Sequence, residues 1–109
     1  MEIINPANGE ILTRVPEDNA SSLQTKYDLL KAAQPSWSRI LLEERISILE
    51  KYSSLLERDM EWLAQTLTDE VGKPLQQSRN EINGSRTRIQ WMLKPVSYTH
   101  LTLPTNREV

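Results

Sequence analysis

The residue types that most often carry out covalent or acid–base chemistry are scarce in this chain. It has no cysteine and a single histidine, His100. Without a thiol there can be no disulfide, no zinc–thiolate site and no cysteine nucleophile. No second histidine or cysteine accompanies His100, so we interpret it as a solvated side chain rather than a metal ligand or a general base. The sequence therefore predicts no metal site.

Adjacent carboxylates are the second kind of residue that could act as a general acid or base. They occur as Glu43–Glu44 and as Asp69–Glu70. Both pairs lie in segments with helical spacing, where neighbouring side chains point about 100° apart. The two members of a pair therefore do not converge on one substrate, and we interpret both pairs as solvated helix surface.

Cations and tryptophans could instead form a binding surface. Arg86 and Arg88 suggest an anion site, but no glycine-rich turn of the G-x-G-x-x-G or Walker kind supports it. Lys73 follows an expected helix end, where a cation is favoured by the helix dipole, so we assign it a structural role. We expect the tryptophans to pack between helices rather than to bind a ligand; they are Trp37, Trp62 and Trp91. No position is predicted to be catalytic, cofactor-binding or metal-binding.

Composition narrows the function classes further. The 109 residues carry a net charge of −2, with scattered lysines and arginines, which argues against nucleic-acid binding. Apolar residues make up only 38% and phenylalanine is absent, which is lean for a self-sufficient core. We find no signal-peptide pattern at the start and no apolar run of membrane-spanning length. A cytoplasmic protein that binds no membrane is expected.

The elements that would position these residues begin with a β-hairpin over residues 3–16. Two apolar arms flank Asn5–Glu10, a segment dense in turn residues, and Asn8–Gly9 can adopt positive φ. Four amphipathic helices should follow. The first begins near Ser21 or Ser22, whose spacing to the residues after it suits a capping box, and stops before Pro35.

The second helix is expected from about Leu42 to Glu57, with two neighbouring apolar stripes that need protein on both sides. The third begins after an Asp59 N-cap and ends at a left-handed Gly72. The fourth follows Pro74 and runs to Leu93. The pattern breaks at Lys94–Pro95, and residues 96–109 read as a short strand or a loose tail.

Several motifs together resemble the aldehyde dehydrogenase superfamily. The opening Ile4-Asn5-Pro6-Ala7-Asn8-Gly9-Glu10 is similar to that family's N-P-x-[TN]-G-E hairpin. Glu44-Arg45 followed by Ile48-Leu49 is similar to its E-R-x-x-x-L helix, and Glu70-Val71-Gly72-Lys73-Pro74 to its E-x-G-K-[PT] junction. The resemblance spans residues 3–93, and the order of the motifs makes it more specific than any one of them.

The resemblance implies a fold and an activity. Residues 1–94 would be an α+β piece, mostly α, from the outer part of the Rossmann-type coenzyme-binding domain. The family oxidises aldehydes with NAD or NADP through a cysteine thiolate and a glutamate, and forms homodimers or tetramers. We expect those catalytic residues and the nucleotide site to lie beyond residue 109, so this segment alone should bind no cofactor and be inactive.

Two further expectations concern the chain as a whole. Residues 95–109 depart from the family and look like translated sequencing-adapter sequence, so we expect a non-native or disordered tail there. The alternative to an enzyme segment is a free-standing helical module that docks a partner and catalyses nothing, because both possibilities predict helices with excess apolar surface. The sequence does not distinguish between NAD and NADP or identify the aldehyde.

Overall fold

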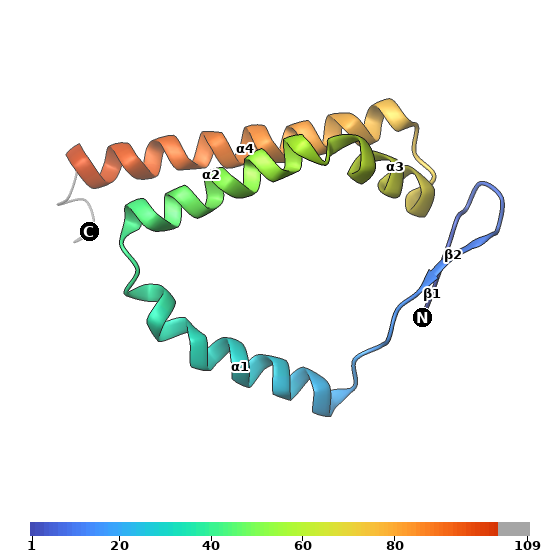
Figure 1. The fold of residues 1–109 in the computed structure, drawn as a ribbon, viewed down its shortest axis with the longest axis horizontal. Coiled ribbons are helices and arrows are strands. Elements are labelled where there is room, and N and C mark those ends of the chain that lie inside the picture. The colour runs from blue at the N-terminus through green and yellow to red at the C-terminus, as the bar shows by residue number, and fades with distance from the viewer. Residues whose placement is uncertain (103–109) are drawn as a thin grey trace.

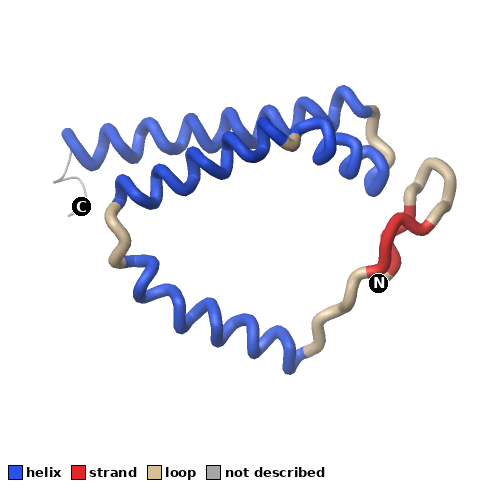
Figure 2. Tube along the Cα trace, in the orientation of Figure 1, coloured by secondary structure: helices blue, strands red, loops and turns tan. Residues whose placement is uncertain are grey.

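The structure is a computed structural model that describes the backbone of residues 1–102 and the side chains of residues 1–94. It contains a two-stranded antiparallel sheet and four helices (Figures 1 and 2). The elements are β1 (Glu2–Ile4), β2 (Ile11–Arg14), α1 (Ala20–Ser38), α2 (Leu42–Arg58), α3 (Met60–Val71) and α4 (Leu75–Thr102). The expected hairpin followed by four helices is confirmed.

The hairpin forms through its own turn chemistry. Asn5 Oδ1 accepts from the Ala7 backbone N–H, and the Gly9 N–H donates to the Asn5 carbonyl. Only Gly9, with φ 77°, uses the positive-φ region, so Asn8 does not need its tolerance for it. The register shifts between Ile3 and Ile4, where a β-bulge interrupts the ladder.

The start of α1 differs from the expected position. Its capping box is formed by Asn19 and Ser22: the Asn19 side chain accepts from the Ser22 N–H, and Ser22 Oγ accepts from the Asn19 N–H. The helix begins at Ala20, so the prediction of a start at Ser21 or Ser22 is one or two residues late. Asn is as good an N-cap as Ser, which is why the pattern alone was ambiguous.

The end of α1 was also predicted wrongly, because the helix runs through Pro35 to Ser38. Proline removes one backbone donor, so only the bond to the carbonyl four residues earlier is lost. The last turn gains two side-chain hydrogen bonds in return, from Ser36 Oγ to the Ala33 carbonyl and from Ser38 Oγ to the Pro35 carbonyl. Trp37 consequently lies in the helix and not in the link after it.

The packed part of the molecule is the layer of α2, α3 and α4. In Figure 1, α2 and α4 run antiparallel and side by side, and α3 packs against the first half of α4. The contact between α3 and α4 is close because small residues occupy it: Ala64 and Ser78 are fully buried. Thr68 Oγ1 and Ser78 Oγ lie 2.8 Å apart and satisfy each other within this contact.

The turn between α3 and α4 also positions the hairpin. Gly72 ends α3 in the predicted left-handed conformation, with φ 83°. A Cβ on Gly72 would lie 2.8 Å from Cγ of Pro6, so the hairpin turn rests directly on this glycine. The predicted Asp59 cap at the other end of α3 makes no side-chain capping hydrogen bond, because its carboxylate is held by Arg58 instead.

Beyond Lys94 the expected break does not occur at the backbone. α4 continues to Thr102, so residues 96–102 are helical rather than a strand or a loose tail. An established helix adds one hydrogen bond per residue, and a single proline within it removes only one donor. Residues 103–109 lie outside the described part of the chain.

The chain as a whole is open rather than compact. Its radius of gyration is 18.9 Å, whereas a compact domain of this length has about 13 Å. α1 makes no extensive contact with another described element, and Figure 1 shows α1 and α2 diverging from the link 39–41. The single buried apolar residue within the described side chains is Ala64. The expected need of α2 for protein on both sides is therefore unmet within this chain.

Candidate functional site

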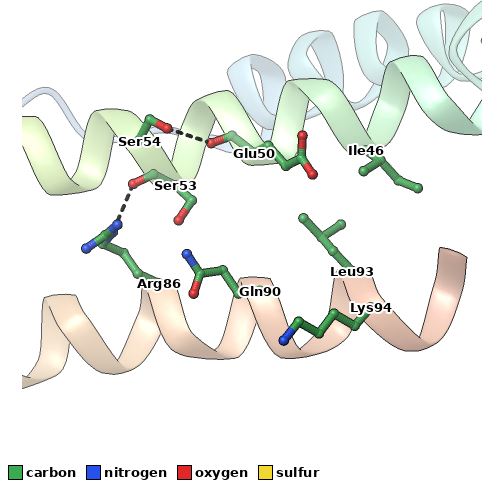
Figure 3. A pocket seen from close by; sticks show the side chains of 8 residues that line it. All are labelled: Ile46, Glu50, Ser53, Ser54, Arg86, Gln90, Leu93 and Lys94. Atoms are coloured by element: carbon green, nitrogen blue, oxygen red, sulfur yellow. Dashed lines mark hydrogen bonds between the residues drawn. The ribbon is translucent and has the colours of Figure 1, made fainter. Parts of the chain in front are cut away.

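A hollow lies between α2 and α4. It encloses about 490 Å³ and is shown in Figure 3. Apolar Ile46 and Leu93 face each other at one end, and Ser53 and Arg86 meet at the other. The antiparallel run of the two helices creates this hollow, because their polar side chains meet there without filling the space between them.

Arg86 closes one end of this hollow. Its Nε donates to the Ser53 carbonyl at 3.1 Å, and its Nη2 donates to Glu57 Oε2 at 3.0 Å. The Arg86 side chain is only 18% exposed, so this charge is largely removed from water and needs both partners. Arg86 therefore acts as a clamp between α4 and α2, not as the anion-binding residue that its position near Arg88 suggested.

Ser53 is the one buried hydroxyl in the hollow without a partner among the described residues. Its Oγ makes no hydrogen bond, although the residue is only 4% exposed. A serine becomes a nucleophile only when a general base lies within hydrogen-bond reach. No histidine side chain is described, and no carboxylate bonds to Ser53 Oγ. We therefore find no catalytic arrangement here.

The remaining cations are also held locally. Lys73 pairs with Glu81, which joins the turn after α3 to α4 and agrees with the structural role assigned to it. Arg88 lies 5.7 Å from the ring centroid of Trp91 on the same helix, which is cation–π distance. Neither cation converges with another on an open pocket.

The tryptophan prediction is wrong for this chain by itself. Trp37, Trp62 and Trp91 are all exposed. Trp37 lines a second hollow of about 300 Å³ together with residues of α2 and α4, but it does not fill it. Exposed tryptophans are expected where a surface is normally covered by other protein.

The carboxylate pairs do not form a site. Glu43 and Glu44 lie exposed in the first turn of α2, where their negative charges interact favourably with the positive end of the helix dipole. Asp69 accepts from Gln65 on its own helix. Among the side chains described, no group of three metal-ligating residues is found, and His100 falls outside that part of the chain.

Among the described side chains, the carboxylates with a shifted pKa all belong to ion pairs on the surface. A hydrogen bond from Arg79 lowers the pKa of Glu61 and links α4 to α3. The pKa of Asp59 is lowered by its hydrogen bond from Arg58, and that of Asp18 by its hydrogen bond from Lys26. None of these groups lines the hollow of Figure 3. The lowered pKa values therefore report ion pairs on the surface and not acid–base residues of a reactive site.

The described residues do not fit a dinucleotide. A nucleotide cradle needs glycines in a strand-to-helix turn, with a helix N-terminus facing the pyrophosphate. The three glycines lie elsewhere: Gly9 is in the hairpin turn, Gly72 caps α3 and Gly84 is inside α4.

No helix in the described region is long and apolar enough to span a membrane.

Sequence reasoning missed two buried polar atoms. They are Ser53 Oγ and Arg45 Nε, both on α2 and both without a hydrogen-bond partner within the described part of the chain. Ser53 lies four residues after Leu49 and three before Leu56, on the same side of the helix, so a hydroxyl at this position in the sequence was the available signal. Buried polar atoms usually have a hydrogen-bond partner in the protein or an ordered water, so these two atoms are exceptions.

Comparison with known proteins gives a consistent picture. The chain matches the family described as the aldehyde dehydrogenase family over residues 1–107, which extends beyond the resemblance over residues 3–93. It is 33% identical over 91 residues to the succinate-semialdehyde dehydrogenase (NADP(+)) GabD of Escherichia coli K12, covering 84% of this chain and 19% of that protein.

Two further relatives have related names. Malonate-semialdehyde dehydrogenase 1 of Shouchella clausii is 35% identical over 81 residues, which is 74% of this chain and 16% of that protein. The 3-sulfolactaldehyde dehydrogenase of Pseudomonas putida is 32% identical over 89 residues, which is 82% of this chain and 18% of that protein. The chain thus spans less than a fifth of the length of these curated relatives.

Proposed function

Because the chain belongs to the aldehyde dehydrogenase family, we propose that it is the amino-terminal part of a subunit that oxidises an aldehyde to a carboxylic acid with NAD(P)⁺. The match to the family over residues 1–107 carries this proposal. The relatives are named for semialdehydes or for 3-sulfolactaldehyde, so a small aldehyde bearing an acidic group is the proposed substrate class.

In such a subunit this segment has a structural task. We place it in the outer layer of the coenzyme-binding domain, where α1 and α2 would lie over the downstream sheet. The exposed apolar side chains on these helices, the open shape and the unpartnered atoms of Ser53 and Arg45 support that placement. The homo-oligomer expected for the family belongs to the same proposal.

The chemistry itself would come from other parts of the subunit. Oxidation by this family's route needs a thiolate that attacks the carbonyl carbon, and this chain has no cysteine. NAD(P)⁺ supplies the hydride acceptor, and the described residues offer no cradle for it. We therefore propose that the 109-residue chain alone reduces no NAD(P)⁺ with any aldehyde.

A chimera tests the proposal directly. Residues 1–94 replace the matched segment of the Escherichia coli succinate-semialdehyde dehydrogenase, and formation of reduced coenzyme is followed by absorbance. We expect a folded, active chimera, because the replaced segment supplies packing rather than reacting groups. A chimera that fails to fold, or that folds into the oligomer of the parent and has no activity, contradicts the assignment.

Two controls sharpen the result. The same chimera carrying Tyr52→Glu should fail to assemble, since this side chain on the outer side of α2 would be buried. The 109-residue chain alone, assayed under the same conditions, should give no signal above a blank. Sequencing the gene beyond codon 94 provides an independent check, because the proposal requires a continuing frame with a glycine-rich strand–helix unit and a later cysteine.

A further inference from the structure

The dipeptide Asn-Gly occurs twice in this chain, in two different backbone settings. Asn8–Gly9 lies in the turn of the hairpin, and Asn83–Gly84 lies inside α4. All four residues are exposed, so access to water does not distinguish the two places. An asparagine followed by glycine can react with its own backbone, because glycine has no side chain to hinder its nitrogen. The backbone conformation therefore decides whether either pair reacts.

The reaction joins two atoms of the pair. The backbone nitrogen of the glycine loses its proton and attacks Cγ of the asparagine, and the side-chain nitrogen takes up a proton and leaves as ammonia. The product is a five-membered cyclic imide, which water then opens to aspartate or isoaspartate. One water molecule is consumed and one ammonia is released, with no oxidation or reduction. The modified side chain carries a negative charge that the amide lacked.

Three hydrogen bonds in the hairpin turn bear on this reaction at Asn8. The Glu10 N–H donates to Asn8 Oδ1 at 2.9 Å, so a donor already faces the oxygen that becomes negative when Cγ is attacked. Asn8 Nδ2 donates to Glu10 Oε2 at 3.3 Å, which places a carboxylate beside the nitrogen that must become positive to leave. The bond from the Gly9 N–H to the Asn5 carbonyl, at 2.8 Å, opposes the attack. It is a single exposed bond, so a small local opening frees the nitrogen.

The helix opposes the same reaction at Asn83. Ring closure brings Cβ, Cα and the carbonyl carbon of the asparagine nearly into one plane with the glycine nitrogen. A helical ψ of about −42° holds Cβ well out of that plane. Residues on both sides of Asn83 are tied to other parts of the chain, because Glu81 pairs with Lys73 and Arg86 clamps α4 to α2. Asn83 can therefore leave the helical ψ only when α4 opens locally.

We propose that Asn8 is a site of spontaneous modification, converted through the cyclic imide to aspartate and isoaspartate, whereas α4 keeps Asn83 unreactive. Glu10 acts as a positioning residue, through the contacts of its N–H and its carboxylate with the Asn8 side chain. The product places a second carboxylate beside Glu10, in the turn that rests on Gly72. The inference goes beyond the proposed function. It rests on bonds among residues 5–10 and on the helical backbone of α4, not on surfaces that the rest of a longer subunit would cover.

The test is to age the purified 109-residue chain in buffer at constant pH and temperature, and to map its peptides by mass spectrometry at intervals. Trypsin separates the two sites, because Asn8 lies in peptide 1–14 and Asn83 in peptide 80–86. We expect Asn8 to be modified at least ~10-fold faster than Asn83. Equal rates, or a faster rate at Asn83, overturn the proposal. So does an Asn8 that remains unmodified throughout.

The same measurement in concentrated guanidinium chloride separates the effect of the fold from that of the flanking sequence. Once the helix is lost, both Asn-Gly pairs are free, so their rates should agree within ~3-fold. A ratio that stays as large in denaturant as in buffer overturns the proposal, because the difference would then come from neighbouring residues. Circular dichroism of the chain in buffer should show its helix content unchanged at the start and the end of ageing.

Glu10→Gln tests the part played by the carboxylate. The new amide oxygen can still accept from Asn8 Nδ2 but carries no negative charge, so we expect Asn8 to react ~3-fold more slowly, with no change at Asn83. Glu17→Gln is the matched control, because it removes the same charge outside the turn and should leave both rates unchanged. An Asn8 rate unaffected by Glu10→Gln, or slowed equally by both substitutions, overturns the role assigned to Glu10.

Discussion

The contact between the hairpin and the end of α3 gives the sharpest test of how this chain is held together. Gly72 has φ 83°, and a Cβ there would lie 2.8 Å from Pro6 Cγ. Gly72→Ala therefore combines two penalties, a strained backbone and a collision with the hairpin turn. The other two glycines separate these effects: Gly9 has φ 77° with nothing within 4 Å of a built Cβ, and Gly84 is helical with open space around it.

The magnitudes follow from these geometries. An alanine in the left-handed region costs about 1–2 kcal/mol, which is the whole effect expected for Gly9→Ala. Gly72→Ala adds about 1–2 kcal/mol, because the proline ring belongs to the turn and the hairpin must shift to relieve the contact. We therefore expect Gly72→Ala to cost about 2–4 kcal/mol in total. Gly84→Ala should stabilise the protein by about 0.5–1 kcal/mol, because alanine is the better helix former.

The assay is urea unfolding followed by circular dichroism at one fixed protein concentration, since association contributes to apparent stability. A double-mutant cycle isolates the collision. Pro6→Ala removes Cγ, and the remaining Cβ lies 3.7 Å from the built position, which is ordinary contact. Gly72→Ala should therefore cost about 1–2 kcal/mol less in the Pro6→Ala background than in the wild-type chain. Equal costs in the two backgrounds, or a Gly72→Ala cost no larger than that of Gly9→Ala, would refute the reasoning.

Three further predictions concern the layer of α2, α3 and α4. The hydrogen bond from Arg79 lowers the pKa of Glu61 below its ordinary value of 4.5, so its stabilisation is present above that pH and is lost as the pH falls through the folded-state pKa. An NMR titration of the Glu61 carboxyl should show the shift, and Arg79→Gln should abolish it. Ala64→Leu should destabilise the chain by about 1–3 kcal/mol in urea unfolding, because Ala64 is fully buried; a neutral result would mean that the α3–α4 contact opens freely. Arg86→Ala should cost about 1–2 kcal/mol, because the largely buried Arg86 loses its hydrogen bonds to the Ser53 carbonyl and to Glu57, which is itself exposed to water; a cost no larger than that of an exposed arginine would contradict the clamp.

Local chemistry explains why part of the fold was predictable. The left-handed end of α3 needs only the positive-φ tolerance of Gly72, and the hairpin turn needs only the residues from Asn5 to Glu10. The errors at Pro35 and Pro95 have a common cause. Proline was interpreted as a stop in both places, but each removes a single backbone donor from a helix that has many others.

Less of the candidate site than of the fold could be predicted from the sequence. The expectation that the chain holds no catalytic residue rests on the missing thiol and the isolated histidine, which are matters of residue type, and it stays a prediction. The clamp formed by Arg86 was not predictable, because it joins positions 33 residues apart along the chain. Nor was the exposure of Trp62, since periodicity identifies an apolar side of a helix without showing what covers it.

The sequence by itself determined the order of the hairpin and four helices, the glycine at the end of α3 and the family, because each depends on residues close together in the chain or on motifs in a fixed order. Only the tertiary structure decided which stripe of α2 packs on α4, that the hairpin rests on Gly72 and that α1 remains apart. These outcomes depend on which surfaces meet in space. Sequence periodicity identifies the apolar side of each helix, but it does not say which other surface packs against that side.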